Sequence, residues 1–546
     1  MTAAPRKMSG GEAIVDALIR NGVDTVFGIP GVQLDPLFDA LYDAQNSIRV
    51  IHTRHEQGAG YMALGYAQAT GRVGTAIVVP GPGLLNASAA ISTGYALNSP
   101  MLCVVGQIPS ALIGKGTGQL HELPDQLAIA RGLTKFAARM DAPADVPATM
   151  AEAFRQLHTG RVRPVEVEMA MDILKNRAEV TPLDPPDAYE RAAPDPDRIE
   201  AAAKLLGEAK NPLIFAGGGA VDAGPELLAL AEMLQAPVVM SRGALGAIDS
   251  RHPLALTQPH GHRLWKDADV VLGVGTRLVP MVPGWGTDDS LKFVRLDIDA
   301  GEMSRSHTPD VAVEADAALG LAALAGAVPA HNRRRADRGA EMAALKAALQ
   351  VEFDKLDPQV PILNAIRRAL PEDGIFVEEL TQPGYVARMA FPVYRPRTYI
   401  NPGYQGTLGY ASPTAMGAKV GRPDARVLAI SGDGGFLFNV QELATAAQHG
   451  IDIVLVVFND GAYGNVKRFQ QQMFDGKEIA VELKNPDFMK LADAFGIQGF
   501  RVNSPAELER AINEGFATPG PTLIEYPLGE VPDPWHLIFQ GKARPS

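Results

Sequence analysis

Hydrophobic positions in the first third of the chain form short apolar runs that alternate with segments of helical periodicity. Residues 11–22 carry apolar side chains at helical spacing and end on Gly22, a residue type that commonly ends helices. Apolar, strand-like runs stand at residues 23–31, 49–56, 74–83 and 100–107. Such runs in alternation with helices predict βαβ units and a parallel sheet that is buried on both faces.

The same alternation returns twice more along the chain. A Pro- and Asp-rich segment, Thr181–Asp197, is typical of a linker between domains and separates the first block from the second. We therefore predict an α/β protein with three doubly wound parallel-sheet domains. Their expected bounds are residues 1–180, 198–345 and 358–530, followed by a C-terminal tail at 531–546.

Composition narrows the class of protein. The 546 residues are 46% hydrophobic and 21% charged, with a net charge of −12, which is the balance of a globular protein. No basic domain or stripe is visible, so we expect no nucleic-acid partner. The short basic cluster Arg333–Arg338 stands beside acidic helical residues and is interpreted as a solvated helix face or a linker.

Cysteine usage and hydropathy favour a cytoplasmic enzyme. One cysteine, Cys103, excludes an internal disulfide and a cysteine-rich zinc site, and its apolar surroundings predict a buried side chain. Residues 1–12 lack the apolar core of a signal peptide, and no run of about 18 apolar residues indicates a membrane span. We therefore expect a cytoplasmic location and no membrane partner.

Two polar motifs at strand ends predict a site for a metal and a phosphate. Gly432-Asp433-Gly434-Gly435 ends one predicted strand, and Asn459-Asp460-Gly461 ends the next, with one helix between them. In a right-handed βαβ unit both ends lie on the same edge of the sheet, so Asp433 and Asn459 are expected to converge. Carboxylate and amide oxygens suit Mg²⁺ or Ca²⁺, and glycines at a helix start let the backbone approach a phosphate. The alternative is that both motifs are simple turns.

A third candidate lies near the N-terminus. Glu56 follows a predicted strand and enters the first turn of a helix, where a carboxylate is electrostatically favourable. Taken alone, it has the alternative of an ordinary charge at a helix start. Neither this region nor Gly81-Pro82-Gly83 fits the GxGxxG fingerprint with its following acidic residue, which disfavours a nicotinamide-dependent dehydrogenase.

Five segments in this order resemble the thiamine-diphosphate-dependent enzymes of the acetolactate synthase, pyruvate oxidase and benzoylformate decarboxylase superfamily. They are NGVDTVFGIPG, RHEQGAGYMALGYAQATG, PGPGLLNASAAI, GTLGYASPTAMGAK and GDGGFLFNVQELATAAQHGIDIVLVVFND. The resemblance covers nearly the whole chain. It implies a pyrimidine-binding, a central Rossmann-like and a diphosphate-binding domain, with thiamine diphosphate and Mg²⁺ as cofactors. It also implies a homodimer or homotetramer with sites at the subunit interface.

The resemblance implies a role for individual residues. Glu56 matches the glutamate that contacts a ring nitrogen of the aminopyrimidine and promotes the imino tautomer, which removes the thiazolium proton. Asp433 and Asn459 match the metal ligands, with the Gly461 carbonyl as the third protein oxygen. Leu408 matches the apolar residue that holds the cofactor in its bent shape, and core packing is its alternative. The other residues matched to cofactor contacts are Gly31, Gly406, Gly432, Gly434 and Gly435.

Several positions depart from acetolactate synthases. His121 stands where those enzymes carry a Phe-Gln-Glu segment, and it is either an acid–base group that faces the reacting carbonyl or a surface or structural histidine. Glu378 and Glu379 stand where a Gly-Gln-His run is usual, and Asp460 replaces a second Asn. We therefore expect decarboxylation or carboligation of a 2-oxo acid, with a specificity that need not be that of an acetolactate synthase.

Alternatives remain for cofactor and reaction. Gly217–Gly219 and Arg242-Gly243 in the central block fit either an FAD loop or an empty Rossmann-like domain, and the empty domain is favoured. The rival reaction is that of a lyase or hydrolase on an acyloin, diketone or 2-hydroxyacyl- or oxalyl-CoA substrate. A non-catalytic thiamine-diphosphate-binding paralogue is the rival of another class, and the presence of Glu56, Asp433 and Asn459 argues against it.

Overall fold

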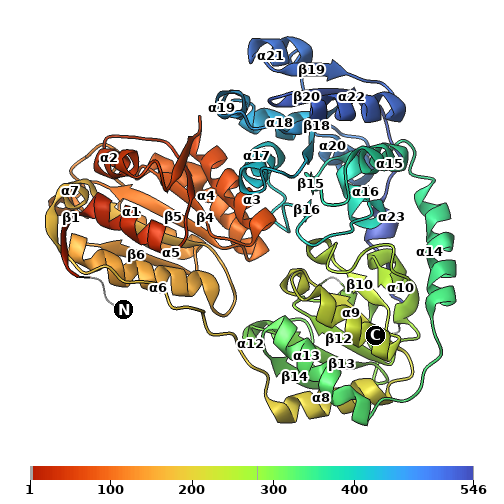
Figure 1. Ribbon diagram of the computed structural model, residues 1–546. Coiled ribbons are helices and arrows are strands. Elements are labelled where there is room, and N and C mark those ends of the chain that lie inside the picture. The colour runs from red at the N-terminus through yellow and green to blue at the C-terminus, as the bar shows by residue number, and fades with distance from the viewer. Residues whose placement is uncertain (1–3, 280, 545–546) are drawn as a thin grey trace.

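A computed structural model describes residues 4–279 and 281–544 of the chain (Figure 1). Each of three domains contains a six-stranded sheet in which every neighbouring pair of strands is parallel. Helices cover both faces of the sheets, which is why the strands read as continuous apolar runs. The predicted fold class, three doubly wound α/β domains, is therefore confirmed.

The first domain has the strand order β3-β2-β4-β5-β7-β6. Its strands are β2 (Thr25–Gly28), β3 (Arg49–His52), β4 (Gly74–Val78), β5 (Met101–Gln107), β6 (Phe136–Met140) and β7 (Val165–Ala170). One face carries α1 (Gly10–Arg20), α2 (Asp35–Asp43), α6 (Val146–His158) and α7 (Met171–Lys175), and the other carries α3 (Glu56–Thr70), α4 (Pro82–Leu97) and α5 (Gln126–Leu133). A small antiparallel sheet joins β1 (Arg6–Ser9) to β8 (Arg177–Val180).

The central domain has the order β11-β10-β9-β12-β13-β14. Its strands are β9 (Pro212–Ala216), β10 (Val238–Met240), β11 (Ala255–Leu256), β12 (Val270–Val274), β13 (Lys292–Asp297) and β14 (Val311–Glu314). Its helices are α8 (Pro196–Glu208), α9 (Gly224–Leu234), α10 (Gln258–Trp265), α11 (Met281–Trp285), α12 (Ala300–Met303) and α13 (Ala317–Ala327). Helix α14 (Gly339–Phe353) then leads to the third domain (Figure 1).

The third domain has the order β16-β15-β17-β18-β20-β19. Its strands are β15 (Ile375–Val377), β16 (Tyr399–Ile400), β17 (Val427–Gly432), β18 (Val454–Asn459), β19 (Gln498–Arg501) and β20 (Thr522–Pro527). Its helices are α15 (Gln359–Ala369), α16 (Gln382–Ala390), α17 (Ala411–Gly421), α18 (Asp433–Phe436), α19 (Glu442–His449), α20 (Gly464–Met473), α21 (Phe488–Ala494), α22 (Pro505–Ala517) and α23 (Trp535–Ile538).

Helices α3 and α17 cross where the first and third domains meet (Figure 1). A Cβ on Gly65 would lie 1.9 Å from the carbonyl oxygen of Thr414, and one on Gly417 would lie 1.8 Å from that of Met62. Only glycine allows the two backbones to approach so closely. The crossing therefore fixes how the first domain sits against the third.

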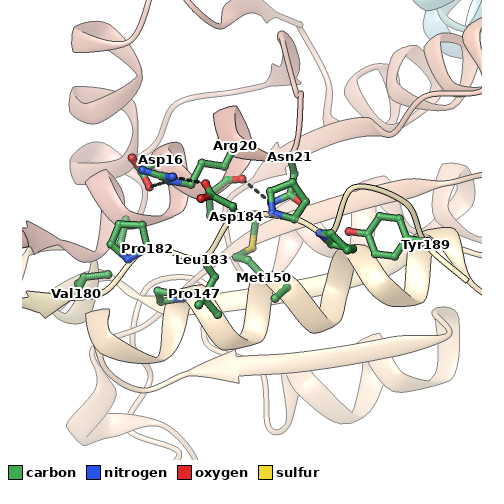
Figure 2. Close-up of a pocket in the computed structure, with 15 residues that line it drawn as sticks. Asp16, Arg20, Asn21, Pro147, Met150, Val180, Pro182, Leu183, Asp184 and Tyr189 are labelled. Carbon is green, nitrogen blue, oxygen red and sulfur yellow. Dashed lines mark hydrogen bonds and ion pairs between the residues drawn. The ribbon is translucent and has the colours of Figure 1, made fainter. Parts of the chain in front are cut away.

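The segment that links the first and central domains packs on the first domain. Residues 182–189 lie across α1 and α6, and Arg20 forms ion pairs with both Asp16 and Asp184 there (Figure 2). The hollow at this place is lined by none of the residues matched to the cofactor. The predicted linker reached Asp197, but α8 already begins at Pro196, because the Asp195 side chain accepts a hydrogen bond from the Asp197 N–H at 2.8 Å.

Other predictions about single residues can be checked directly. Cys103 is 2% exposed, so its predicted burial is confirmed.

The Arg333–Arg338 segment is a connection between the central domain and α14, where Arg335 donates to the carbonyls of Leu206, Gly207 and Ala209 at the end of α8. Among the described residues, no helix is long and apolar enough to cross a membrane.

Candidate active site

Asp433 lies at the carboxyl edge of the third sheet, directly after β17. Its side chain is 1% exposed. Its Oδ1 accepts the N–H of Gly434 at 2.9 Å, and its Oδ2 accepts the N–H of Gly461 at 2.9 Å. Strands β17 and β18 are hydrogen-bonded neighbours, and this pairing brings the two motifs together at one edge of the sheet.

A second carboxylate, Asp460, lies directly beside Asp433. Burial, together with the negative charge of Asp433, raises the pKa of the Asp460 carboxyl to about 7. Two carboxylates in contact repel each other, and a divalent cation between them would remove that repulsion. Asp460 stands inside the Asn459-Asp460-Gly461 motif, but the sequence did not single it out as a candidate ligand.

The two other groups predicted to bind the metal make hydrogen bonds to protein. Asn459 donates its Nδ2 to Glu525 at 2.8 Å, and its Oδ1 accepts the N–H of Gly461 at 3.3 Å. The carbonyl of Gly461 accepts the N–H of Leu483 at 2.7 Å. The ligand roles of Asn459 and Gly461 therefore stay predictions.

Asn485 adds a neutral group that the sequence did not reveal. Its Nδ2 lies 2.6 Å from Asp433 Oδ2 and 2.9 Å from Asn459 Oδ1. The side-chain amide of Asn485 thus bridges Asp433, which follows β17, and Asn459, the last residue of β18.

Glu379, buried behind the glycine-rich loops, organises the region predicted to bind diphosphate. Its Oε1 accepts the N–H groups of Gly409 at 2.8 Å and Tyr410 at 3.3 Å, and its Oε2 accepts the hydroxyl of Ser431. Burial raises the pKa of the Glu379 carboxyl to about 7, against the effect of these hydrogen bonds. A Cβ on Gly435 would lie 2.7 Å from Glu379 Oε1, so this carboxylate touches both loops.

The Gly406–Gly409 loop presents an apolar side chain to solvent. Leu408 is 37% exposed, so it is not an ordinary core residue. The neighbouring Thr407 is tied to the first domain, because its hydroxyl accepts the Tyr61 hydroxyl at 2.6 Å and lies 3.2 Å from that of Thr93. The loop is therefore held between the first and third domains.

Glu56 begins α3 in the first domain. The side chain of His55 caps the helix by accepting the N–H of Gln57 at 3.1 Å, and Asn86 Nδ2 donates to Glu56 Oε2 at 3.0 Å. Glu442 of the third domain accepts the N–H of His55 at 2.9 Å. Within the described residues, no hydrogen bond or ion pair joins Glu56 to the Asp433–Asp460 pair.

His121 and Gly31 both lie in the first domain. The carbonyl oxygen of His121 would be 2.4 Å from a Cβ on Gly81, and His121 itself has a φ of +69°. In the described structure, His121 Nδ1 is buried without a hydrogen-bond partner. A Cβ on Gly31 would lie 2.4 Å from Val79 Cγ1, so the loop after β2 runs close to the loop after β4.

Comparison with known proteins places all three domains in one family. The N-terminal TPP binding domain of thiamine pyrophosphate enzymes matches residues 8–129, the central domain matches 199–324, and the C-terminal TPP binding domain matches 381–526. The chain therefore belongs to the thiamine pyrophosphate enzymes, and it is a thiamine-diphosphate-dependent carboligase or decarboxylase.

Full-length relatives support this assignment. The chain is 36% identical over 540 residues to a probable 2-ketoarginine decarboxylase of Pseudomonas aeruginosa, covering 95% of this chain and 94% of the relative. It is 34% identical over 572 residues to the acetolactate synthase large subunit of Corynebacterium glutamicum, with 99% and 90% covered. It is 32% identical over 560 residues to the large subunit of acetolactate synthase isozyme 1 of Escherichia coli, with 99% and 98% covered.

Proposed function

We propose that this enzyme decarboxylates a 2-oxo acid and, when an aldehyde or ketone acceptor is present, ligates the resulting fragment to it. The observation that carries the proposal is the Asp433–Asp460 pair at the carboxyl edge of the third sheet, beside the glycines of α18. Relatives whose names denote a 2-ketoarginine decarboxylase and acetolactate synthases support a 2-oxo acid as substrate.

The residues present fit a Mg²⁺-bridged diphosphate. Asp433 and Asp460 would supply two charged oxygens to the cation, and Asn459 would offer a neutral one. Gly434 and Gly435, at the start of α18, would let the backbone approach the diphosphate. When bound, thiamine diphosphate supplies the carbanion chemistry and acts as the electron sink.

Glu56 has the proposed role of holding a proton at the aminopyrimidine ring. Its carboxylate is oriented by Asn86, and its helix start is fixed to the third domain through Glu442. Because Glu56 is not joined to Asp433 within the chain, we propose that each complete site combines Glu56 of one copy with Asp433 of a second. A dimer is the smallest assembly that satisfies this arrangement, and a dimer of dimers repeats it.

The central domain is proposed to work without FAD. The N–H of Gly217 donates to the carbonyl of Val274 at 2.9 Å, and that of Gly219 donates to Gly275 at 3.2 Å. A phosphate cradle needs backbone N–H groups that are not already engaged. His121 stays a candidate acid–base group, because it lies beside Gly81, which belongs to one of the five segments that resemble the family. A cytoplasmic location also stays a prediction.

A screen of 2-oxo acids tests the reaction. The purified chain is loaded with thiamine diphosphate and Mg²⁺ and offered 2-oxo acids with and without aldehyde acceptors, while CO₂ and ligated product are followed. Mass analysis of gently extracted cofactor should yield thiamine diphosphate. Turnover of acyloins or acyl-CoA thioesters alone, with no 2-oxo acid consumed, would instead favour the lyase alternative.

A further inference from the structure

Three buried N–H donors lie unpaired near one aromatic ring of the third domain. Among the described residues, Arg388 Nε, Arg468 Nη1 and Trp535 Nε1 have no hydrogen-bond partner. The ring centroid of Trp535 lies 4.8 Å from that of Tyr385, and the guanidinium carbon of Arg388 lies 5.8 Å from the Tyr385 centroid. We name these four residues the Tyr385 cluster. Leaving buried donors unpaired is costly, so their convergence points to an absent acceptor.

The positively charged side chains of the cluster favour an anion as the ligand. One buried carboxylate, Glu378, faces two arginines, with Oε1 3.3 Å from Arg242 Nη1 and 3.9 Å from Arg388 Nη2. Arg468 is left with a carbonyl only, because its Nη2 donates to Val531 O at 2.8 Å. Among the described residues, Glu378 is thus the one carboxylate that forms an ion pair with any of these three arginines.

The same arginines also influence the pKa of the Tyr385 hydroxyl. Burial raises the pKa of the Tyr385 hydroxyl, the positive charges of Arg388, Arg242 and Arg468 act to lower it, and the negative charge of Glu378 acts to raise it. Phe469, which follows Arg468 on α20, has its ring centroid 5.4 Å from that of Trp535, so α20 itself packs against the cluster.

The cluster stands next to the Asp433–Asp460 pair. A Cβ on Gly464 would lie 2.2 Å from Asp460 Oδ2 and 3.1 Å from Gln382 Nε2, so the starts of α16 and α20 meet at that pair. Tyr385 and Arg388 lie three and six residues beyond Gln382, and Arg468 lies four beyond Gly464. At 1.5 Å per residue, the cluster begins about 5 Å along these helices.

We propose that the Tyr385 cluster binds a carboxylate of a small molecule, and that this is the second carboxylate of a dicarboxylic 2-oxo acid. The inference rests on the proposed function for its substrate, whereas the anion site rests on the unpaired donors and on the ring contacts of Tyr385. Arginine holds carboxylates through several N–H donors at once, and the Trp535 N–H adds a neutral donor. Arg388 keeps 21% of its side chain exposed, so one member of the cluster reaches solvent.

The same charges disfavour a cationic substrate. A 2-oxo acid that ends in a guanidinium, such as the one in the name of the Pseudomonas relative, would place like charge against Arg388 and Arg468. We therefore expect this chain to differ in substrate specificity from that relative, to which it is 36% identical.

Matched substrate pairs test the inference. For 2-oxoglutarate against 2-oxopentanoate, we expect kcat/KM to favour the diacid by at least about tenfold, because buried hydrogen bonds to charged groups are strong. Arg468→Met should lower this ratio by about tenfold or more, and Trp535→Phe, which keeps the ring but removes the donor, should lower it less. Arg510→Met, a change at an exposed arginine of α22, is the matched control and should leave the ratio unaltered. A wild-type ratio near one, or an equal loss for both substrates in Arg468→Met, would overturn the inference.

A binding measurement separates this inference from the proposed reaction. Calorimetry on the full chain should detect glutarate, with about tenfold weaker binding to Arg468→Met, and should detect no binding of pentanoate. If no 2-oxo acid is turned over while glutarate binds in this way, the proposed function fails and the anion site stands. If neither acid binds, or both bind equally, the anion site is refuted whatever the enzyme turns over. Competition by acetate as strong as that by glutarate would refute the assignment to a substrate's second carboxylate.

Discussion

The carboxyl groups of Asp433 and Asp460 lie side by side at the ends of adjacent parallel strands, where neither has a cationic side chain as a hydrogen-bonding partner among the described residues. Two bare charges in contact repel each other, and a divalent cation bound between them, as we propose, would relieve that repulsion. This relationship connects the fold to the cofactor, because the edge that brings the carboxylates together also carries the glycines of α18.

Removing one carboxylate should weaken Mg²⁺-dependent binding of the cofactor. We expect Asp433→Asn and Asp460→Asn each to raise the Kd for thiamine diphosphate with Mg²⁺ by about tenfold or more, since each removes one charged ligand. Titration calorimetry with and without EDTA measures this. Asp424→Asn, at an exposed aspartate, is the matched control. Unchanged Mg²⁺ dependence in Asp460→Asn would show that Asn459 and Asp433 suffice.

The subunit arrangement can be tested by complementation. Glu56→Gln and Asp433→Asn should each reduce turnover by about 100-fold or more while leaving the far-ultraviolet circular dichroism unaltered. When the two variants are co-expressed, mixed dimers contain one intact site, so about one quarter of wild-type activity should return. Glu226→Gln, in the first turn of α9, is the control for a helix-start glutamate. No recovery on mixing would place Glu56 and Asp433 in a site within one chain.

The buried carboxyl of Glu379 should make stability fall with rising pH. Its pKa is raised from 4.5 to about 7, so between these values the folded chain holds a proton that the unfolded chain has released. The contribution of this group to the free energy of unfolding should therefore decline by about 3 kcal/mol between pH 4.5 and 7 and stay low above that.

Glu379→Gln should lessen this pH dependence without abolishing it, because Asp460, whose pKa is also raised to about 7, titrates in the same range. Urea unfolding between pH 5 and 8, monitored by fluorescence, measures it for the wild type and the variant. Glu514→Gln, at an exposed residue of α22, should keep the wild-type profile. A Glu379→Gln profile parallel to that of the wild type would contradict the assignment.

Alanine at the helix crossing should destabilise the pairing of the first and third domains. A Cβ on Gly65 would overlap the Thr414 carbonyl, so Gly65→Ala should lower the free energy of unfolding by about 1–3 kcal/mol or more. Gly326→Ala in α13, where a Cβ meets nothing within 4 Å, should instead be neutral or stabilise by up to about 1 kcal/mol. Thermal unfolding compares the two. If Gly65→Ala and Gly326→Ala changed the stability equally, α3 and α17 could move apart at no cost in stability, and the prediction would be wrong.

Sequence predicted the features that follow from chain topology. The meeting of the Gly432-Asp433 and Asn459-Asp460 motifs was foreseeable because strand order and crossover handedness place both strand ends on one edge. The contacts of Glu379 were not, because Gly409, Tyr410 and Ser431 reach it from 30 to 52 residues away. The contact between Asp460 and Asp433 was not foreseeable either, because strand topology brings the two motifs together without saying which of the neighbours Asn459 and Asp460 faces Asp433.

The crossing of α3 and α17 also bears on how such chains can be recombined. The first domain can pack closely against the third because Gly65 and Gly417 carry no side chain. A hybrid that takes its first domain from a relative therefore needs glycine at both positions more than it needs matched surface residues. At this junction, exchange of domains among these enzymes therefore depends on whether the main chains of α3 and α17 can approach each other closely.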